Sequence, residues 1–198
     1  MMEKHVLGLE LPTDPRWVNI AEKNIQEILI DHAYCEQKAA SSGISLIVRF
    51  SEKEKLVEML TALVAEEWSH FERVMEQLKK RGWSLGRKRK DEYVDQLHKI
   101  LIKGGSRDFQ LVESLLMHAL IEARSCERFR LLWKEISDPE LSQFYYELMV
   151  SEAGHYKSFL AMAKEYMEEE TVMTRWRTML DAEAEIVKNL EVRGDRMH

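Results

Sequence analysis

The chain contains few of the residues that interrupt or cross-link a fold: among 198 residues there are three Pro, eight Gly and two Cys. So few helix-breaking residues argue against an architecture of many short strands. The two cysteines, Cys35 and Cys126, are too few for a disulfide framework, and we interpret both as small core residues of helices. The first residues contain no apolar stretch long enough for a signal peptide, and no later apolar run approaches the roughly 20 residues of a membrane span. We therefore expect a cytoplasmic protein without membrane association.

The composition is that of a folded helical domain. Hydrophobic residues make up 45% of the chain and charged residues 32%, which is too apolar for a disordered protein. A chain of this length fits one domain, so we expect a single domain over residues 1–198. Within it we expect an N-terminal extension at 1–13, a basic crossover at 83–105 and a polar, frayed tail at 191–198.

Capping residues and apolar periodicity predict an all-α fold. Asp14 and Asp138 each precede a proline, which indicates a helix start, and Ser51 with Glu54 matches a capping box. The expected helices cover residues 14–50, 51–82, 106–135, 139–168 and 171–190, with a short helix at 91–103. The connections are short, long and short between the first four long helices, which is typical of a ferritin-like four-helix bundle with an extra C-terminal helix.

Two of the long helices carry the same motif, Glu-x-x-His. It occurs as Glu67 to His70 and as Glu152 to His155. Residues three apart lie on one face of a helix, so each pair can bind one metal ion. A single motif of this kind is usually a solvated helix face, but its repetition on two helices indicates a metal site.

The other two helices each place a glutamate in an apolar stripe, Glu36 and Glu122. The separation from Glu36 to Glu67 is 31 residues and that from Glu122 to Glu152 is 30. A glutamate followed at nearly the same distance by Glu-x-x-His therefore occurs twice in the chain, and we call each occurrence a half-site. The glutamates of the first hairpin reach matched depths only if its first helix continues through Gly43. We therefore interpret Gly43 as a close-packing residue inside that helix.

Four buried carboxylates require compensating cations, because each unpaired buried charge costs several kcal/mol. Two divalent ions would neutralise them. Carboxylate and imidazole ligands with open positions for oxygen favour iron, with manganese as the rival metal. The predicted ligands are Glu36, Glu67, His70, Glu122, Glu152 and His155.

Further polar and aromatic residues lie close to these ligands in the sequence. His32 and His118 each precede a glutamate ligand by one helical turn, where they are either partners of the ligands or ordinary core histidines. Tyr34, Trp68 and Tyr156 are candidates for electron transfer or for simple packing. Of these aromatic residues, we include only Tyr156 with His32 and His118 as a candidate partner of the metal ligands.

Four segments give the sequence a more specific resemblance: IDHAYCEQKAAS, EEWSHFERV, LIEARSCERF and SEAGHYKSFL. Together they resemble the tRNA hydroxylases of the MiaE family, over about Leu7 to Leu190. The resemblance implies the same six metal ligands and an oxygen-dependent di-iron monooxygenase. Its substrate would be the isopentenyl group of 2-methylthio-isopentenyl-adenosine in tRNA, and a separate reductase would supply electrons. A monomer and a small homo-oligomer both remain open.

A basic run, KKRGWSLGRKRK, covers residues 79–90 of a chain whose net charge is −6. By itself it fits a solvated loop, but with the family resemblance it indicates contact with tRNA phosphates, with a tryptophan available for stacking. The residues predicted to bind tRNA are Arg81, Trp83, Arg87, Lys88, Arg89 and Lys90. Three arginines of the third long helix, Arg124, Arg128 and Arg130, either line the substrate entrance or pair with surface acids.

Other ferritin-like functions would share the metal ligands. A peroxidase, a manganese catalase or a ferroxidase with an iron-storage role needs no RNA substrate. Rubrerythrin-type peroxidases usually add a Cys-x-x-Cys module, which this sequence lacks. A cationic crossover does not suit an iron-storage cage, so hydroxylation of tRNA is the favoured interpretation.

Overall fold

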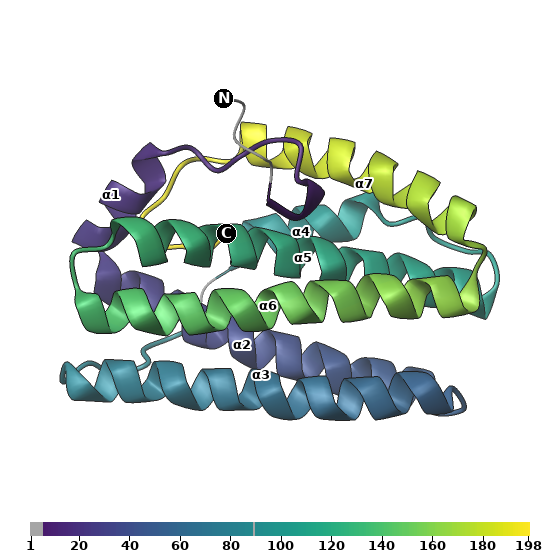
Figure 1. The fold of residues 1–198 in the computed structure, drawn as a ribbon, viewed down its shortest axis with the longest axis horizontal. Helices are drawn as coiled ribbons and strands as arrows, with labels where there is room; N and C mark the ends of the chain where they lie inside the picture. The colour runs from purple at the N-terminus through teal and green to yellow at the C-terminus, as the bar shows by residue number, and fades with distance from the viewer. Residues whose placement is uncertain (1–5, 89) are drawn as a thin grey trace. The chain divides into compact units, whose positions relative to one another are not determined.

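The computed structural model describes residues 6–88 and 90–198. Over these residues the chain forms seven α-helices and a short 3-10 helix and has no β-strand, which confirms the all-α prediction (Figure 1). The elements are η1 (Val6–Gly8), α1 (Arg16–Lys23), α2 (Ile25–Arg49), α3 (Glu54–Lys80), α4 (Glu92–Ile100), α5 (Arg107–Glu135), α6 (Pro139–Tyr166) and α7 (Glu169–Asn189).

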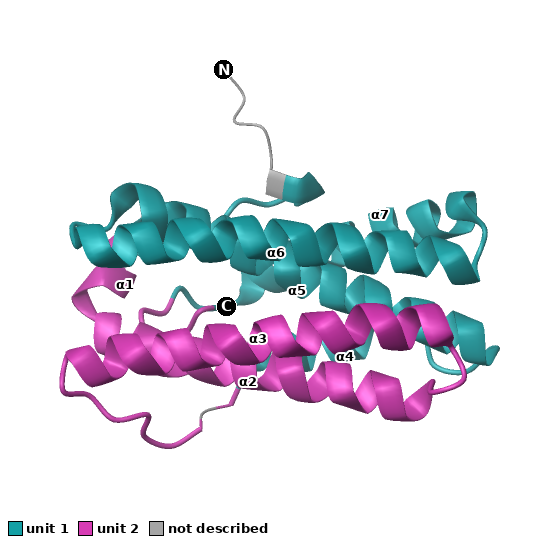
Figure 2. Ribbon diagram, turned by 60° about the horizontal axis from the view of Figure 1, so that its bottom comes forward, with its two compact units in different colours: residues 1–18, 91–192, 198 teal, residues 19–90, 193–197 magenta. Residues whose placement is uncertain are grey.

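The helices fall into two compact units (Figure 2). Unit 1 contains the described residues up to Val18, residues 91–192 and His198, and unit 2 contains residues 19–90 and 193–197. In unit 2, α2 and α3 form a long antiparallel hairpin. In unit 1, α5 and α6 form a second one, against which α7 packs. The predicted order of two hairpins joined by a long crossover is therefore present.

The first predicted helix, 14–50, is interrupted at Asn24, so its continuity was predicted wrongly. The Asn24 side-chain amide donates to the carbonyl of Ile20 at 2.8 Å, and the Asn24 backbone N–H donates to Ala21 instead. The side chain thus takes the acceptor that a continuous helix would use for the backbone. Beyond this break, α2 does continue through Gly43, as predicted. A Cβ on Gly43 would lie 2.5 Å from Val64 Cγ2, which confirms the close-packing interpretation.

The predicted capping box at Ser51 and Glu54 is wrong, because α3 begins at Glu54 after Lys53, with no side-chain cap. The backbone N–H of Lys53 donates to Phe50 at 2.9 Å, so the intervening residues are used in a tight turn. The cap at Asp138 forms as predicted, accepting from the backbone N–H groups of Glu140 and Leu141. Asp91 and Ser106, where two further helices were expected to begin, also cap their helices by accepting from backbone N–H groups of the first turn. The other helix ends fall within three residues of their predicted positions.

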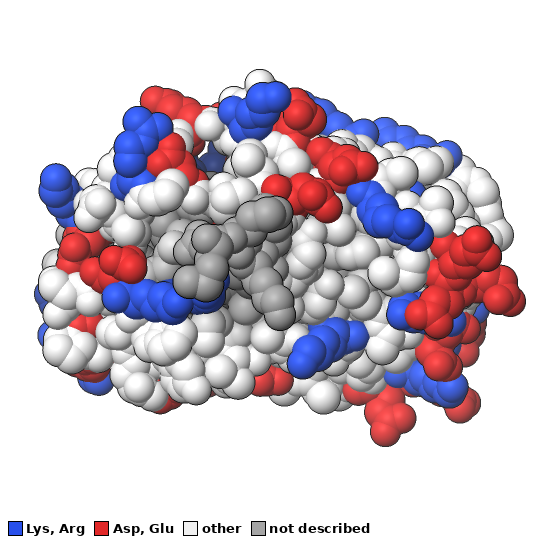
Figure 3. All heavy atoms as spheres, turned by 45° about the horizontal axis from the view of Figure 1, so that its top comes forward, with Lys and Arg blue, Asp and Glu red and all other residues white. Residues whose placement is uncertain are grey.

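Charged side chains of both signs are interspersed on the face drawn in Figure 3. No helix of the described part of the chain has both the length and the apolar character that a membrane crossing requires. Of the two cysteines, Cys126 is buried as predicted, whereas Cys35 on α2 is only half-buried.

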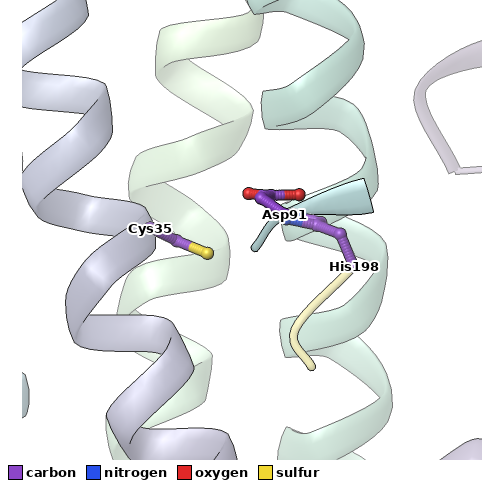
Figure 4. Close-up of side chains that lie close together, drawn as sticks. All are labelled: Cys35, Asp91 and His198. Atoms are coloured by element: carbon purple, nitrogen blue, oxygen red, sulfur yellow. The ribbon is translucent and has the colours of Figure 1, made fainter. Parts of the chain in front are cut away.

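The C-terminal tail is packed against the helices rather than frayed, so this prediction was wrong. Met197 is 0% exposed, and its backbone N–H donates to the Asp31 carboxylate of α2 at 2.8 Å within unit 2. In unit 1 the His198 ring stacks on Tyr93, with 5.1 Å between ring centroids. Figure 4 shows the His198 side chain close to Asp91, the capping residue of α4. An apolar residue and backbone hydrogen bonds therefore fix a tail whose composition suggests disorder.

Candidate metal centre

The hairpin of unit 2 brings three of the predicted ligands together. Glu36 of α2 and Glu67 and His70 of α3 are all buried, and their ligand atoms lie within 4.8 Å of one another. His70 Nδ1 is 3.6 Å from Glu36 Oε2 and 3.8 Å from Glu67 Oε2. Side chains three apart on α3 share one face, and the antiparallel pairing with α2 adds the third donor.

His32 is in direct contact with this half-site. Its Nε2 lies 2.6 Å from Glu36 Oε1, and the imidazole is fully buried on the same helix, one turn earlier. A hydrogen bond from an imidazole N–H fixes which way the carboxylate points, as partners of metal ligands commonly do. The placement of His32 matches the first of its two sequence interpretations.

The hairpin of unit 1 assembles the matching three residues. Glu122 of α5 and Glu152 and His155 of α6 are buried, and their ligand atoms also lie within 4.8 Å of one another. His155 Nδ1 is 3.3 Å from Glu152 Oε2. The two hairpins thus carry the same donor set, two carboxylates and one imidazole, in the same arrangement along the chain.

The chemistry of each donor set fits a divalent transition metal. Carboxylate oxygen and imidazole nitrogen suit iron, manganese and zinc, and three donors leave coordination positions for other ligands. Each half-site also buries two carboxylates, which would cost several kcal/mol per charge without a cation. Buried acids at this density in an otherwise apolar stripe are best explained by metal binding.

The other residues predicted near the metals have contacts of their own. His118 Nδ1 donates to the Ser114 carbonyl at 2.6 Å, within its own helix. Tyr156 packs against Trp176 of α7 with 5.9 Å between ring centroids, and burial raises the pKa of its hydroxyl. Trp68 is exposed on the outer face of α3. The contact with Trp176 favours packing as the role of Tyr156.

The basic run lies at the end of α3 and in the segment that follows it. Arg87, Lys88 and Lys90 are exposed, and Arg89 lies outside the described residues. Arg81 is half-buried and donates to the side chain of Gln77 at 2.6 Å, so it is held against α3. Trp83 is also half-buried. Lys79 and Lys80, in the last turn of α3, are exposed as well, so the run has exposed cations both at the end of α3 and at Arg87, Lys88 and Lys90.

A buried charge network that sequence analysis did not identify holds α5 in unit 1. Arg124 is two residues after Glu122, and its guanidinium donates two hydrogen bonds of 2.9 Å to Glu183 of α7. It also donates to Glu127 and to the carbonyl of Leu11. The position and rotation of α5, which carries Glu122, are therefore set in part by this network. The interpretations of Arg124 as an entrance or surface residue are wrong, since the side chain is 0% exposed.

Burial and neighbouring charges shift the pKa values of two groups of the network, Glu183 and Tyr93. Burial raises the pKa of Glu183, and the neighbouring Arg124 partly opposes that rise. Tyr93 donates to Glu183 at 3.0 Å, and burial raises the pKa of Tyr93 well above its ordinary value. One sequence signal could have revealed the network: in α7 a glutamate continues the buried stripe of Val172, Trp176 and Met179 at helical spacing.

The chain is similar in sequence to known proteins over almost its whole length. The whole chain, residues 1–198, matches the model of the family described as tRNA-(MS[2]IO[6]A)-hydroxylase (MiaE). It is 35% identical to a tRNA 2-(methylsulfanyl)-N(6)-isopentenyladenosine(37) hydroxylase of Pseudomonas putida, covering 91% of this chain and 87% of that protein. A hydroxylase of the same name from Salmonella typhimurium is 25% identical, covering 90% and 83%.

A solved structure is also similar over almost the full length. It is a protein from Synechococcus described as having aldehyde deformylating oxygenase activity. The TM-score is 0.90 at 34% sequence identity, and the match covers 96% of this chain and 94% of that one. The predicted fold class, all-α and ferritin-like, is confirmed by this similarity.

Proposed function

The chain belongs to the tRNA-(MS[2]IO[6]A)-hydroxylase (MiaE) family, and from this we propose that it hydroxylates the isopentenyl group of 2-methylthio-isopentenyl-adenosine in tRNA. The observation that carries the proposal is the pair of buried half-sites in a chain that matches the family over its whole length. Because the proposed substrate is tRNA, we also propose a cytoplasmic location.

The proposed centre holds two iron ions, one for the half-site of each hairpin. Each half-site would supply two carboxylates and one imidazole, so that two divalent ions balance four buried negative charges. The ligands are Glu36, Glu67, His70, Glu122, Glu152 and His155. Manganese has the same ligand preferences and is the rival metal. Metal analysis after reconstitution under iron or manganese should give about two ions per chain, and a content below about one would contradict a di-metal centre.

When bound, a pair of irons supplies the redox chemistry that activates molecular oxygen for hydroxylation of an unactivated carbon. The electrons come from a separate reductase. The protein's own contribution is to hold the ligands and keep water away from them. Leu63 and Val74 flank the motif of α3, and Leu148 and Phe159 flank that of α6, and all four are buried. His32 holds the Glu36 carboxylate through its hydrogen bond of 2.6 Å.

The exposed cations of residues 87–90 are the proposed contact with tRNA phosphates. Each phosphate contact releases condensed counterions, so binding that uses these side chains weakens as salt concentration rises. Replacing Arg87, Lys88, Arg89 and Lys90 with glutamine should weaken tRNA binding. The slope of log K against log salt should become shallower by up to about 3, because each lost contact removes roughly 0.7 to 0.9.

A matched control removes exposed cations elsewhere in the chain. Lys157 of α6 and Arg177 and Lys188 of α7 are exposed and lie far from the basic run in sequence. Replacing these three with glutamine should leave the salt slope near that of the wild type. Equal slopes for the two multiple variants would show that residues 87–90 act only as a solubilising loop.

The decisive experiment tests the reaction itself. The iron-loaded, reduced protein is incubated with oxygen and tRNA that carries the isopentenyl modification, and the digested nucleosides are analysed by mass spectrometry. The expected result is a gain of one oxygen atom on the modified nucleoside. Absence of product with a fully metal-loaded protein would contradict the proposal. Rapid peroxide breakdown, or a cage-sized particle on gel filtration, would then favour the peroxidase, catalase or iron-storage alternatives.

A further inference from the structure

The segment that carries the exposed cations is attached to the rest of unit 2 by hydrogen bonds to its backbone. The hydroxyl of Tyr34, on α2, donates to the carbonyl of Gly86 at 2.8 Å. Arg196, in the C-terminal tail, donates from Nε to the carbonyl of Lys90 at 3.3 Å. These two contacts bracket Arg87 and Lys88, whose side chains remain exposed. The backbone is therefore held at Gly86 and at Lys90, while the side chains of Arg87 and Lys88 face solvent.

The tail contact is itself supported by buried groups. The residue after Arg196, Met197, is fully buried, and its backbone N–H donates to Asp31 of α2 at 2.8 Å. Arg196 also donates to the Asp195 carboxylate at 3.0 Å, which orients its guanidinium. The tail residues 193–197 are thus held against α2 by Met197. This places Arg196 next to Lys90.

The start of the segment is restrained as well. The backbone N–H of Trp83 donates to the Leu78 carbonyl at 3.0 Å, which closes the end of α3. Gly86 has a φ of +69°, a conformation that side chains with a Cβ rarely adopt, and its carbonyl is the one that Tyr34 binds. A loop of this composition would otherwise lose much conformational freedom on binding, and that loss lowers affinity.

We propose that Tyr34 and Arg196 are positioning residues that hold the basic segment ready for RNA phosphates. The inference rests on the proposed tRNA contact of residues 87–90 and adds the groups that order them. Both anchors lead to α2, the helix of Glu36, where Tyr34 precedes that glutamate by two residues. The segment proposed to bind RNA is thus anchored to the helix that carries Glu36, one of the proposed metal ligands.

Two conservative variants test the inference. Tyr34→Phe removes only the hydroxyl that binds Gly86, and Arg196→Gln removes the guanidinium at Lys90. The controls are Tyr146→Phe, on an exposed tyrosine of α6, and Lys188→Gln, which removes one exposed cation of α7. All four proteins are compared as full-length, metal-loaded enzymes.

The first measurement needs no RNA. Limited digestion with trypsin should cut after Arg87, Lys88 and Lys90 several times faster in both test variants than in the wild type or the controls. The metal content should be the same in all five proteins. Equal cleavage rates would show that the two hydrogen bonds do not order the segment, and would overturn the inference.

The second measurement is tRNA affinity and turnover over a range of salt concentrations. Each test variant should bind tRNA about two- to tenfold more weakly, the range expected for loss of one hydrogen bond. The salt slope should be unchanged, because both test variants retain the cations of residues 87–90 that are proposed to contact phosphates, and KM for tRNA should rise while kcat at saturation stays constant. A fall in kcat alone for Tyr34→Phe would overturn the inference and favour electron transfer as the role of this residue.

Failure of the underlying proposal looks different. If residues 87–90 do not contact RNA, tRNA binds equally to the wild type, to the test variants and to the protein in which Arg87, Lys88, Arg89 and Lys90 are replaced by glutamine. The trypsin measurement would still separate the test variants from the controls. If only the positioning role of Tyr34 and Arg196 is wrong, the results differ. The protein with Arg87, Lys88, Arg89 and Lys90 replaced by glutamine then binds tRNA weakly, whereas the two test variants bind tRNA and are cleaved by trypsin as the wild type is.

Discussion

Replacing Arg124 with methionine is expected to destabilise the protein strongly. The guanidinium donates to Glu183 and Glu127, and both the arginine and Glu183 are 0% exposed. Removing one partner of a buried ion pair costs about 3 to 5 kcal/mol, because the other charge stays buried. Glu127 keeps two hydrogen bonds from Thr13, at 2.6 and 2.9 Å, and Glu183 keeps the one from Tyr93. These contacts favour the lower end of the range, about 3 kcal/mol.

The loss should depend on pH in a defined direction. Burial raises the pKa of Glu183 above its ordinary value of 4.5, and Arg124 opposes the rise. Without Arg124 the pKa of Glu183 in the folded protein rises further, so the folded state favours the neutral acid. A group with a raised folded pKa loses its stabilising contribution as pH increases. The variant should therefore be closest to the wild type near pH 4.5 and least stable, relative to it, at pH 8.

Urea and thermal unfolding followed by circular dichroism measure this effect. For a chain of this size, 1 kcal/mol corresponds to about 2 to 4 °C in Tm, so the expected decrease at pH 8 is roughly 6 to 12 °C. Arg16→Met is the control, since Arg16 pairs with Asp14 at the surface and its side chain is 80% exposed. That variant should leave Tm unchanged. A decrease for Arg124→Met below about 1 kcal/mol, or one independent of pH, would refute the role assigned to the buried network.

Three further outcomes are expected. Glu122→Ala should abolish turnover and lower the bound metal measured by mass spectrometry, while the helical circular dichroism spectrum is retained; full metal content would contradict its role as a ligand. Burial raises the pKa of the Cys126 thiol to about 12, so at pH 8 a thiol reagent should modify only the half-buried Cys35 quickly, and both thiols after denaturation. Gly43→Ala should lower the unfolding free energy by about 1 to 3 kcal/mol because of the contact with Val64. Adding Val64→Ala should restore most of that loss, and no restoration would show that another contact is responsible.

Short-range patterns carried most of the prediction of the fold. The cap at Asp138 depends on the residues directly after it, and helical periodicity depends on residues within two turns. The two Glu-x-x-His pairs could be identified for the same reason, because each lies within one turn of a helix, whereas Glu36 and Glu122 were chosen from their matched separations from these pairs. Gly43 was interpreted correctly because the separation of the glutamates required a helix that continues through it.

The errors arose where local signals compete. Asn24 lies within a stretch with helical periodicity, yet its side chain takes the backbone acceptor of Ile20 and ends α1. Ser51 has the sequence of a capping residue, but the turn after Phe50 uses its position. In both cases side-chain and backbone hydrogen bonds offer an alternative to a continuous helix, and the sequence pattern alone does not show which one forms.

The amino-acid sequence by itself determined the helices, the repeated ligand motif and the cationic run, because each depends on neighbours along the chain. Only the tertiary structure decided which distant groups meet. The pairing of Arg124 with Glu183, the burial of Met197 beside Asp31 and the bond from Tyr34 to Gly86 each join residues 50 or more positions apart. Such contacts depend on how whole helices pack, since buried charges and backbone groups must find partners wherever the packing places them.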